Sequence, residues 1–460
     1  MLVVFTATLV MVLLNEVNLS YLNHDYPYKD GLITTADEYS YFYPAESYYQ
    51  TGEWNASGDG SKAYLRTPGY GFIYLIALVI GQSKAFLVLK IFQISCYAGS
   101  LFLLFKIVSD FISKPFSLIA TFIFGLLPCF NGFTYYTLSE SVIPFFMLWW
   151  VYGILKPRKH DFLLLFLSTS FLVLIRPQLI VFPIVFAVYY LLKKNKRSIY
   201  LFVGLLPLLF WQMRTASIIG EWPDIHPVYN LSNNSIFRPP HQELTELFKI
   251  WEHESDVFHE NMGILSADTS QLARNKVAAT IPIHLQTDVL QILKEFQLFR
   301  FKQQLYSGNK INSYLPGEKE LTNNIHQLTQ KLKSENKLDY YLLTPLKSLK
   351  KLLVTSMMNL NIYQDAWKEN LWVFVLKLLS LTFILLGFVT SILFCFVSKC
   401  SIEYRLLAFS VLISIFYLVY FQRLNEERYL YPYLGMFFIY TCLYADSLIK
   451  LLAKRKSPQF

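Results

Sequence analysis

Long apolar runs alternate with short polar segments along most of this chain. A helix needs about 20 predominantly apolar residues to cross the roughly 30 Å hydrocarbon core of a bilayer. Segments close to that length predict ten transmembrane helices, at about 1–20, 84–108, 115–131, 136–155, 161–175, 177–192, 198–216, 370–397, 404–422 and 429–450. The first is interpreted as an uncleaved span, because it lacks the basic N-terminal region of a signal peptide.

One further apolar run, GYGFIYLIALVIG at 69–81, is too short for a span and is predicted to lie along the outer interface. With 69–81 outside the bilayer core and Met1 in the cytoplasm, the basic clusters of the membrane part share one side, as the positive-inside rule requires. These clusters are Lys106 and Lys114; Lys156, Arg158 and Lys159; Lys193, Lys194, Lys196 and Arg197; Lys399 and Arg405; and Lys450, Lys454, Arg455 and Lys456. Both termini are therefore predicted to be cytoplasmic.

Two polar regions then lie outside, at 21–83 and 217–369. The second contains 16 Lys/Arg and 17 Asp/Glu and shows helical periodicity, for example at 289–301 and 323–333. The predicted fold class is an all-α polytopic membrane protein with interfacial helices in the first outer loop and a helical extracytoplasmic cap domain. Its predicted parts are a transmembrane module with its first outer loop (1–216), the cap domain (217–369) and C-terminal transmembrane helices (370–460).

The composition supports a membrane protein and excludes several other classes. Hydrophobic residues make up 54% of the chain and charged residues 16%, against roughly 25% charged in soluble domains. A disordered chain, a collagen and a secreted disulfide scaffold are excluded. The net charge of +9 arises mainly at the cytoplasmic rim, where orientation in the bilayer explains it. No nucleic-acid partner is predicted.

The first outer loop contains a pattern typical of a helix start. Thr35 to Glu38 has the form of a capping box, with Thr35 as N-cap and Glu38 at the third helical position. Asp37 would then lie in the first turn, where the helix dipole favours an anion. Pro44 predicts that this helix is short or kinked.

These residues also resemble the GT-C superfamily of polytopic glycosyltransferases, in particular bacterial members of the protein-mannosyltransferase and aminoarabinose-transferase type. The resemblance covers about 1–215 and, more loosely, 400–440. The matching segments are DEYSYFYPAESYYQTGEW (37–54), RTPGY (66–70), YYTLSESVIPFF (135–146), RPQ (176–178) and RLNEERYLYPY (423–433).

The resemblance implies a glycosyltransferase in a bacterial inner (plasma) membrane, with an active site that faces outward. Its donor would be a sugar carried by a polyprenyl phosphate, and its acceptor a lipid, a glycan or a protein. It further implies an essential acidic residue in the first outer loop, basic residues that hold the lipid phosphate, and inversion at the anomeric carbon. The partners are thus the donor, the acceptor and the membrane lipids.

Transfer from a lipid phosphate needs a base for the acceptor hydroxyl and cations for the departing phosphate. Asp37 is the predicted base, although helix capping would equally explain an acidic first turn. Glu38 is either its capping partner or, with the roles exchanged, the base. Glu140, at the outer end of a span, is a second catalytic candidate or a dipole contact. A divalent metal ion, if one is used, would bind Asp37 and Glu140.

Arginines at the outer ends of apolar segments are the predicted phosphate ligands. Arg66 precedes the short apolar helix at headgroup depth. Its alternative interpretation is an ordinary contact with the phosphates of membrane lipids. Arg176 and Arg428 would be costly against lipid tails. For these two, a structural ion pair with Glu140, Glu426 or Glu427 is the alternative interpretation.

Other functions share some of these features. A ligase or polymerase of lipid-linked oligosaccharide would use the same donor class, but typically has paired arginines in outer loops. A transporter of lipid-linked glycans predicts charges within spans and paired broken helices, and few mid-span charges occur (Lys90 is one). A non-enzymatic receptor would use 217–369 to bind its partner.

Overall fold

The computed structural model describes residues 2–21, 28–35, 37–55, 66–157, 161–219, 239–251, 281–305, 315–355, 369–396, 400–422 and 426–456. Within these ranges the chain is almost wholly helical, as predicted, and its strands form one two-stranded antiparallel hairpin. Of the motifs above, Ala36 and residues 423–425 lie outside the described ranges.

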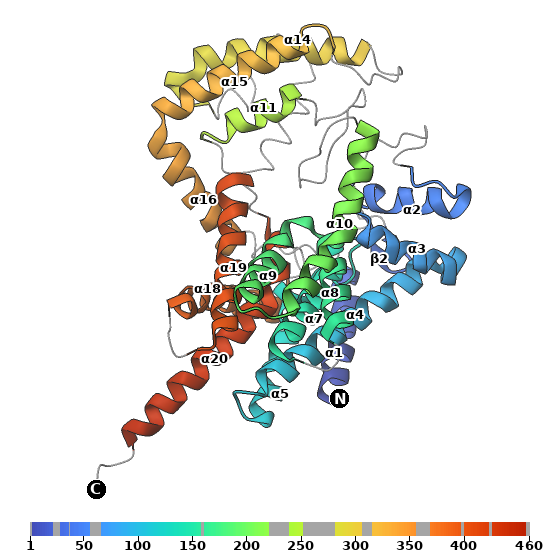
Figure 1. The fold of residues 1–460 in the computed structure, drawn as a ribbon, viewed down its shortest axis with the longest axis vertical. Helices are drawn as coiled ribbons and strands as arrows, with labels where there is room; N and C mark the ends of the chain where they lie inside the picture. The colour runs from blue at the N-terminus through green and yellow to red at the C-terminus, as the bar shows by residue number, and fades with distance from the viewer. Residues whose placement is uncertain are drawn as a thin grey trace.

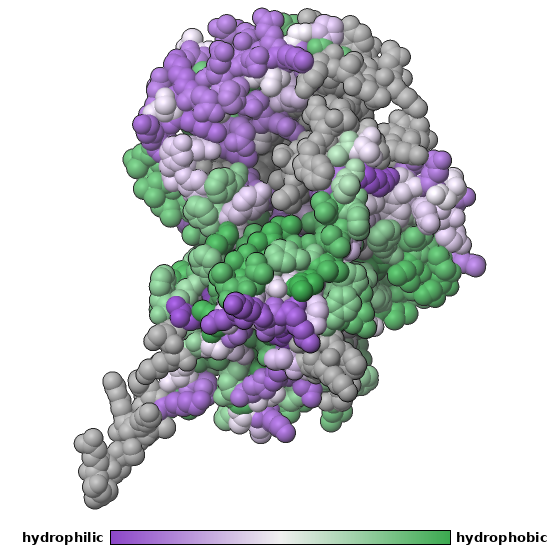
Figure 2. All heavy atoms as spheres, viewed as in Figure 1, coloured by the Kyte–Doolittle hydropathy of each residue, from purple (hydrophilic) through white to green (hydrophobic). Residues whose placement is uncertain are grey.

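An apolar bundle occupies the middle of the molecule, and Figure 2 shows it as a hydrophobic belt between two more hydrophilic ends. Four stretches are long and apolar enough to cross a membrane, namely Gly69–Val108, Arg197–Ser217, Leu371–Phe396 and Ile402–Gln422. Shorter apolar helices accompany them, so the chain has the make-up of a multi-pass membrane protein. The helices of the bundle are α1 (Leu2–Tyr21), α4 (Ala85–Val108), α5 (Lys114–Leu126), α6 (Pro128–Asn131), α7 (Ile143–Leu155), α8 (Asp161–Ile175), α9 (Val181–Leu192), α10 (Arg197–Ile219), α18 (Leu371–Phe396), α19 (Ile402–Tyr417) with its π-helical continuation (Leu418–Gln422), and α20 (Tyr431–Lys456).

Two predicted spans are shorter in the structure than in the sequence pattern. The segment expected at 115–131 is broken between α5 and α6, because Leu127 precedes Pro128 and is extended (φ −70°, ψ 128°). The segment expected at 136–155 becomes α-helical only at Ile143. Thirteen helical residues span about 20 Å, less than the bilayer core, so the number of ten spans stays a prediction.

A second group of helices lies at one end of the molecule (Figure 1). Helices α11 (Pro239–Phe248), α14 (Gln286–Leu305) and α15 (Glu318–Glu335) share a hydrophobic core of their own, separate from that of the bundle. α14 and α15 contain the segments at 289–301 and 323–333 that the periodicity predicted to be helical. α16 (Thr344–Lys350), between two π-helical turns (Asp339–Leu343 and Lys351–Thr355), leads back toward the bundle. The start of α1 and the end of α20 lie toward the opposite end.

The first outer loop begins with a hairpin that the sequence pattern did not reveal. Strands β1 (Tyr28–Lys29) and β2 (Leu32–Ile33) are joined by Asp30 and Gly31, which both have positive φ (48° and 76°), as a two-residue type I′ turn requires. β2 is anchored to the segment before α7: the Ile33 amide donates to Tyr135 O (2.8 Å), and the Thr137 amide donates to Ile33 O (3.0 Å).

The predicted capping box forms only in part. Helix α2 (Tyr39–Thr51) has Glu38 as its N-cap, not Thr35, and the Thr35 hydroxyl has no hydrogen-bond partner among the described residues. The Thr35 amide does contact the Glu38 carboxylate. The helix starts later than predicted because the pairing of β2 keeps the chain extended up to this point. Pro44 lies inside this short helix.

The short apolar helix is present with the predicted limits, as α3 (Gly69–Gly81). It ends where Gln82 adopts a positive φ of 48°, and a 3₁₀ turn (Gln82–Lys84) leads into α4. Gly69 lies directly against the α8 backbone: a Cβ there would be 2.5 Å from the Leu174 carbonyl carbon and 2.6 Å from the Ile175 nitrogen. This contact brings the start of α3 beside the end of α8. Its interfacial position stays a prediction.

Candidate active site

Each predicted site residue lies in a loop or a 3₁₀ turn just before a helix. Asp37 precedes α2 and Arg66 precedes α3, whereas Glu140 lies in the turn before α7 (Ser139–Ser141). Arg176 separates α8 from the turn before α9 (Pro177–Ile180), and Arg428 lies in the turn before α20 (Glu427–Leu430). Proline favours such starts, and it holds the preceding residue extended, as at Arg176 (φ −140°, ψ 96°).

Asp37 is held between two arginines from distant parts of the chain. Arg66 Nη2 donates to its Oδ1 (3.2 Å), and Arg428 Nη1 donates to its Oδ2 (2.6 Å). Burial alone would raise the pKa of Asp37. The charges of Arg66 and Arg428, with their hydrogen bonds, outweigh burial and hold the pKa below its ordinary value. Asp37 is therefore an ionised carboxylate of low basicity in this arrangement.

Glu140 forms a second, more deeply buried ion pair. Its side chain is 3% exposed, and it contacts Arg176, whose side chain is 11% exposed. Ser139 Oγ donates to Glu140 Oε2 (3.1 Å), and Arg428 Nε lies 4.0 Å from Oε1. A buried carboxylate with this set of partners is stabilised in its charged form.

Arg428 connects the two carboxylates. Besides Asp37 and Glu140, it forms an ion pair with Glu426, whose Oε2 lies 2.6 Å from Arg428 Nε. Tyr429 flanks both arginines that approach Glu140. Its ring centroid lies 5.3 Å from Arg428 Cζ and 5.6 Å from Arg176 Cζ. The ion pairs proposed as the alternative interpretation of Arg176 and Arg428 are thus present, in the same cluster as Asp37.

Glu38 is the one predicted site residue outside this arginine cluster. Its Oε2 accepts a hydrogen bond from the Thr137 hydroxyl. Burial raises the pKa of Glu38, and the Thr137 hydrogen bond opposes that rise. Because the Thr137 amide donates to Ile33 O (3.0 Å), Glu38 helps to fix the loop that presents Asp37.

Several residues at the site were not predicted from the sequence. Tyr41 lies under Arg66, with 4.5 Å from Cζ to the ring centroid, and its hydroxyl is 3.5 Å from Ser139 Oγ. Gln93 is buried, and its amide nitrogen lies within hydrogen-bond distance of Tyr70 Oη (2.9 Å), Tyr136 O (3.0 Å) and Ser141 Oγ (2.8 Å). Tyr41 could have been suspected from its spacing of four residues after Asp37. Gln93 gives no signal beyond being polar within an apolar run.

The carboxylates of the described cluster are paired with arginines. Among the described residues, no three His, Cys, Asp or Glu side chains are grouped to hold a metal ion. The oxygens of Asp37 and Glu140 are taken by guanidiniums, which a divalent ion would have to displace. Metal dependence stays a prediction.

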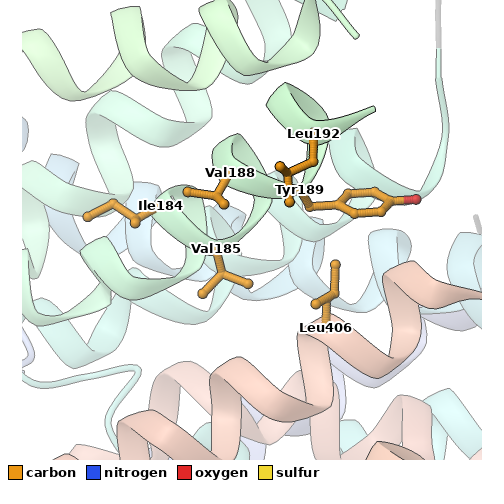
Figure 3. A pocket seen from close by; sticks show the side chains of 6 residues that line it. All are labelled: Ile184, Val185, Val188, Tyr189, Leu192 and Leu406. Carbon is orange, nitrogen blue, oxygen red and sulfur yellow. The ribbon is translucent and has the colours of Figure 1, made fainter. Parts of the chain in front are cut away.

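An apolar groove lies elsewhere, between α9 and α19 (Figure 3). Only Tyr189 contributes a polar group, and its hydroxyl donates to Glu403 Oε1 (3.2 Å). Such a lining can hold an acyl chain but has no group for chemistry. The lining residues are Ile184, Val185, Val188, Tyr189, Leu192 and Leu406.

No protein-family model matches this chain, and no curated protein matches it. Among solved structures, it is similar to two crystal structures of ArnT from Cupriavidus metallidurans, each with 13% sequence identity. For the apo state the TM-score is 0.33, with 94% of this chain and 76% of that chain covered. For the form bound to undecaprenyl phosphate it is 0.34, with 99% and 81% covered.

Proposed function

We propose that this chain is a GT-C-type membrane glycosyltransferase, which transfers a sugar from a polyprenyl-phosphate donor to an acceptor on the outer face of a bacterial inner membrane. The observation that carries the proposal is the position of Asp37, between Arg66 and Arg428 and next to the Glu140–Arg176 pair. One cluster thus contains a base for an acceptor and cations for a phosphate, at the ends of apolar helices.

The arginines bind the donor phosphate in this mechanism. Guanidiniums pair with phosphate oxygens through two parallel hydrogen bonds. Arg66 and Arg428 are 19% and 24% exposed, so an entering phosphate can reach them. Their charges are aimed at the oxygen that gains negative charge as the glycosidic bond breaks. Arg176 is more deeply buried and completes the positive environment.

Donor binding then activates Asp37. When the phosphate attracts Arg66 and Arg428, Asp37 loses the charges that lower its pKa, while burial continues to raise it. The carboxylate becomes a stronger base once the donor is present. It takes the proton of the acceptor hydroxyl, whose oxygen attacks the anomeric carbon from the face opposite the phosphate. The C–O bond to phosphate breaks, and the polyprenyl phosphate leaves with the bonding electrons, giving an inverted product.

The direct test compares membrane lipids from cells with and without this chain, by mass spectrometry. We expect a polyprenyl-phosphate sugar to accumulate without the chain and a glycosylated product to disappear. Accumulation of lipid-linked oligosaccharides of uniform length would instead support a ligase or polymerase. A donor that accumulates on the cytoplasmic leaflet alone would support a transporter, and unchanged lipids would contradict all three.

The pH dependence of purified enzyme should separate free from donor-bound Asp37. The acid limb of kcat/KM for the donor reports the free enzyme, where the pKa of Asp37 is lowered, so this limb should lie below the ordinary pKa of an aspartate. The acid limb of kcat reports the donor-bound enzyme. It should lie at higher pH, because the donor phosphate pairs with Arg66 and Arg428 and takes their charges away from Asp37. A sugar phosphodiester does not titrate in this range. If the acid limbs of kcat and kcat/KM fall at the same pH, activation of Asp37 by the donor is contradicted.

The lowered pKa of Asp37 also stabilises the fold at neutral pH. This contribution is lost as the pH falls through the pKa of Asp37 in the folded protein.

A further inference from the structure

A fourth arginine, Arg214, lies near the end of α10, beside the segment that follows α2. Its Nη2 donates to Trp54 O (3.2 Å), and its Cζ lies 4.7 Å from the centroid of the Trp211 ring. The side chain is half-buried. Unlike the three arginines of the active-site cluster, it forms no ion pair with any carboxylate of the described residues.

Polar atoms around Arg214 are buried without a hydrogen-bond partner among the described residues. They include two donors, Arg214 Nη1 and Trp211 Nε1, and one acceptor, Asn55 Oδ1. The Asn55 amide donates to Glu53 Oε2 (3.3 Å), and Glu53 itself is exposed. Buried donors of this kind are normally satisfied, so a guanidinium N–H and an indole N–H here favour an external acceptor with negative charge.

A cluster of aromatic rings lies beside this arginine. Trp54 lies edge-on to Trp211, with 6.3 Å between ring centroids, and it also contacts Phe72 (5.1 Å) and Tyr48 (6.2 Å). Tryptophan and tyrosine are typical of the headgroup layer, where one side of the ring is apolar and the other is wet. A charged donor among such rings, at the end of an apolar helix, is suited to a lipid headgroup.

We propose that Arg214, Trp211 and Trp54 form a second anion site, which binds the phosphate of a lipid headgroup. The phosphate oxygens accept from Arg214 Nη1 and Trp211 Nε1, while the rings contact the glycerol or sugar carbons next to the phosphate. Arg214 is suited to this because it carries a charge that no described carboxylate neutralises, whereas Asp37, Glu140 and Glu426 balance the other three arginines.

The second anion site and the active-site cluster both contact α3. A Cβ on Gly71 would be 2.8 Å from Tyr41 O and 3.1 Å from Trp54 Cζ2, so these two residues meet at the same point of α3. Tyr41 is the residue under Arg66. A bound lipid phosphate would therefore be connected to the transfer site through α3, whether it belongs to a bulk phospholipid or to a phosphorylated acceptor.

Retention of phosphatidylglycerol by the purified full chain tests this site without requiring activity. The protein is transferred into nanodiscs of phosphatidylcholine with or without phosphatidylglycerol, and the lipids it retains are counted by native mass spectrometry. We expect Arg214→Gln to weaken retention about tenfold, since a charge-assisted hydrogen bond is lost. Trp211→Phe keeps the ring, removes the N–H and should weaken retention less. Lys347→Gln removes an exposed positive charge and is the matched control.

Each outcome bears on the proposal. Unchanged retention in Arg214→Gln, or an equal loss in Lys347→Gln, overturns it. If Arg214→Gln fails to fold, Trp211→Phe decides alone. Loss of retention with unchanged transfer in pure phosphatidylcholine identifies bulk lipid as the source. If Arg214→Gln in pure phosphatidylcholine raises the KM for the acceptor and leaves kcat unchanged, the bound phosphate is that of the acceptor. If Arg214→Gln loses phosphatidylglycerol and the natural chain transfers no sugar, the proposed function is rejected and the second anion site is retained.

Discussion

Replacing Asp37 with asparagine should abolish sugar transfer and leave the protein folded in the membrane. Asparagine has nearly the same volume but cannot accept a proton, so we expect transfer to fall by about 10² to 10⁴. Folding should survive because Arg428 keeps its contacts with Glu140 and Glu426. Transfer is measured with purified enzyme and a polyprenyl-phosphate sugar, and folding by the thermal unfolding midpoint.

Donor affinity distinguishes a catalytic from a structural role for Asp37. In the variant, Arg66 and Arg428 no longer have Asp37 as a competing anion, so the donor should bind at least as tightly as to the natural chain. Asp30→Asn makes the same change at an exposed residue of the same loop and should retain transfer. Normal transfer by Asp37→Asn would show that Asp37 is not the base. Joint loss of folding and donor binding would show that it is structural.

The residues of the candidate site stand out in the sequence largely because polar groups are rare at the outer ends of apolar segments. Arg66, Arg176 and Arg428 are conspicuous on this background, and all three lie in one cluster. Their pairing could not be predicted, because Asp37 and Arg428 are 391 residues apart and only the packing of α20 brings them together. The capping pattern at Thr35 was misleading for a related reason. A local motif competes with tertiary contacts, and here the pairing of β2 with the segment before α7 prevails.

The fold shows the same division between local and non-local information. The apolar pattern predicted α3 to its end residues, because glycines bound the run at Gly69 and Gly81. It overestimated the segments at 115–131 and 136–155, because hydropathy does not distinguish a helix from buried irregular chain. Residues 133–142 are buried and apolar in part, yet they form turns held by β2 and Gln93.

Replacing Arg176 with glutamine should destabilise the protein more than any other single change at the active site. The pair with Glu140 is buried, at 11% and 3% exposed, and removing one partner leaves an uncompensated charge. Such changes cost about 3–5 kcal/mol, and we expect the lower end because Arg428 Nε remains 4.0 Å from Glu140. Lys156→Gln breaks a partly exposed pair with Asp110 and should cost under about 1 kcal/mol.

The double variant Glu140→Gln/Arg176→Gln separates stability from function. Without either charge, most of the lost stability should return, because no uncompensated charge stays buried and the two amides can hydrogen-bond to each other. If Arg176 also binds the donor, the double variant will recover its thermal midpoint and keep a raised KM for the donor. If the thermal midpoint and the KM for the donor both return to their natural values, the Glu140–Arg176 pair is purely structural. Phosphate binding then falls to Arg66 and Arg428. A double variant as unstable as Arg176→Gln alone would show that Arg176 acts on the fold through other contacts, such as its packing against Tyr429.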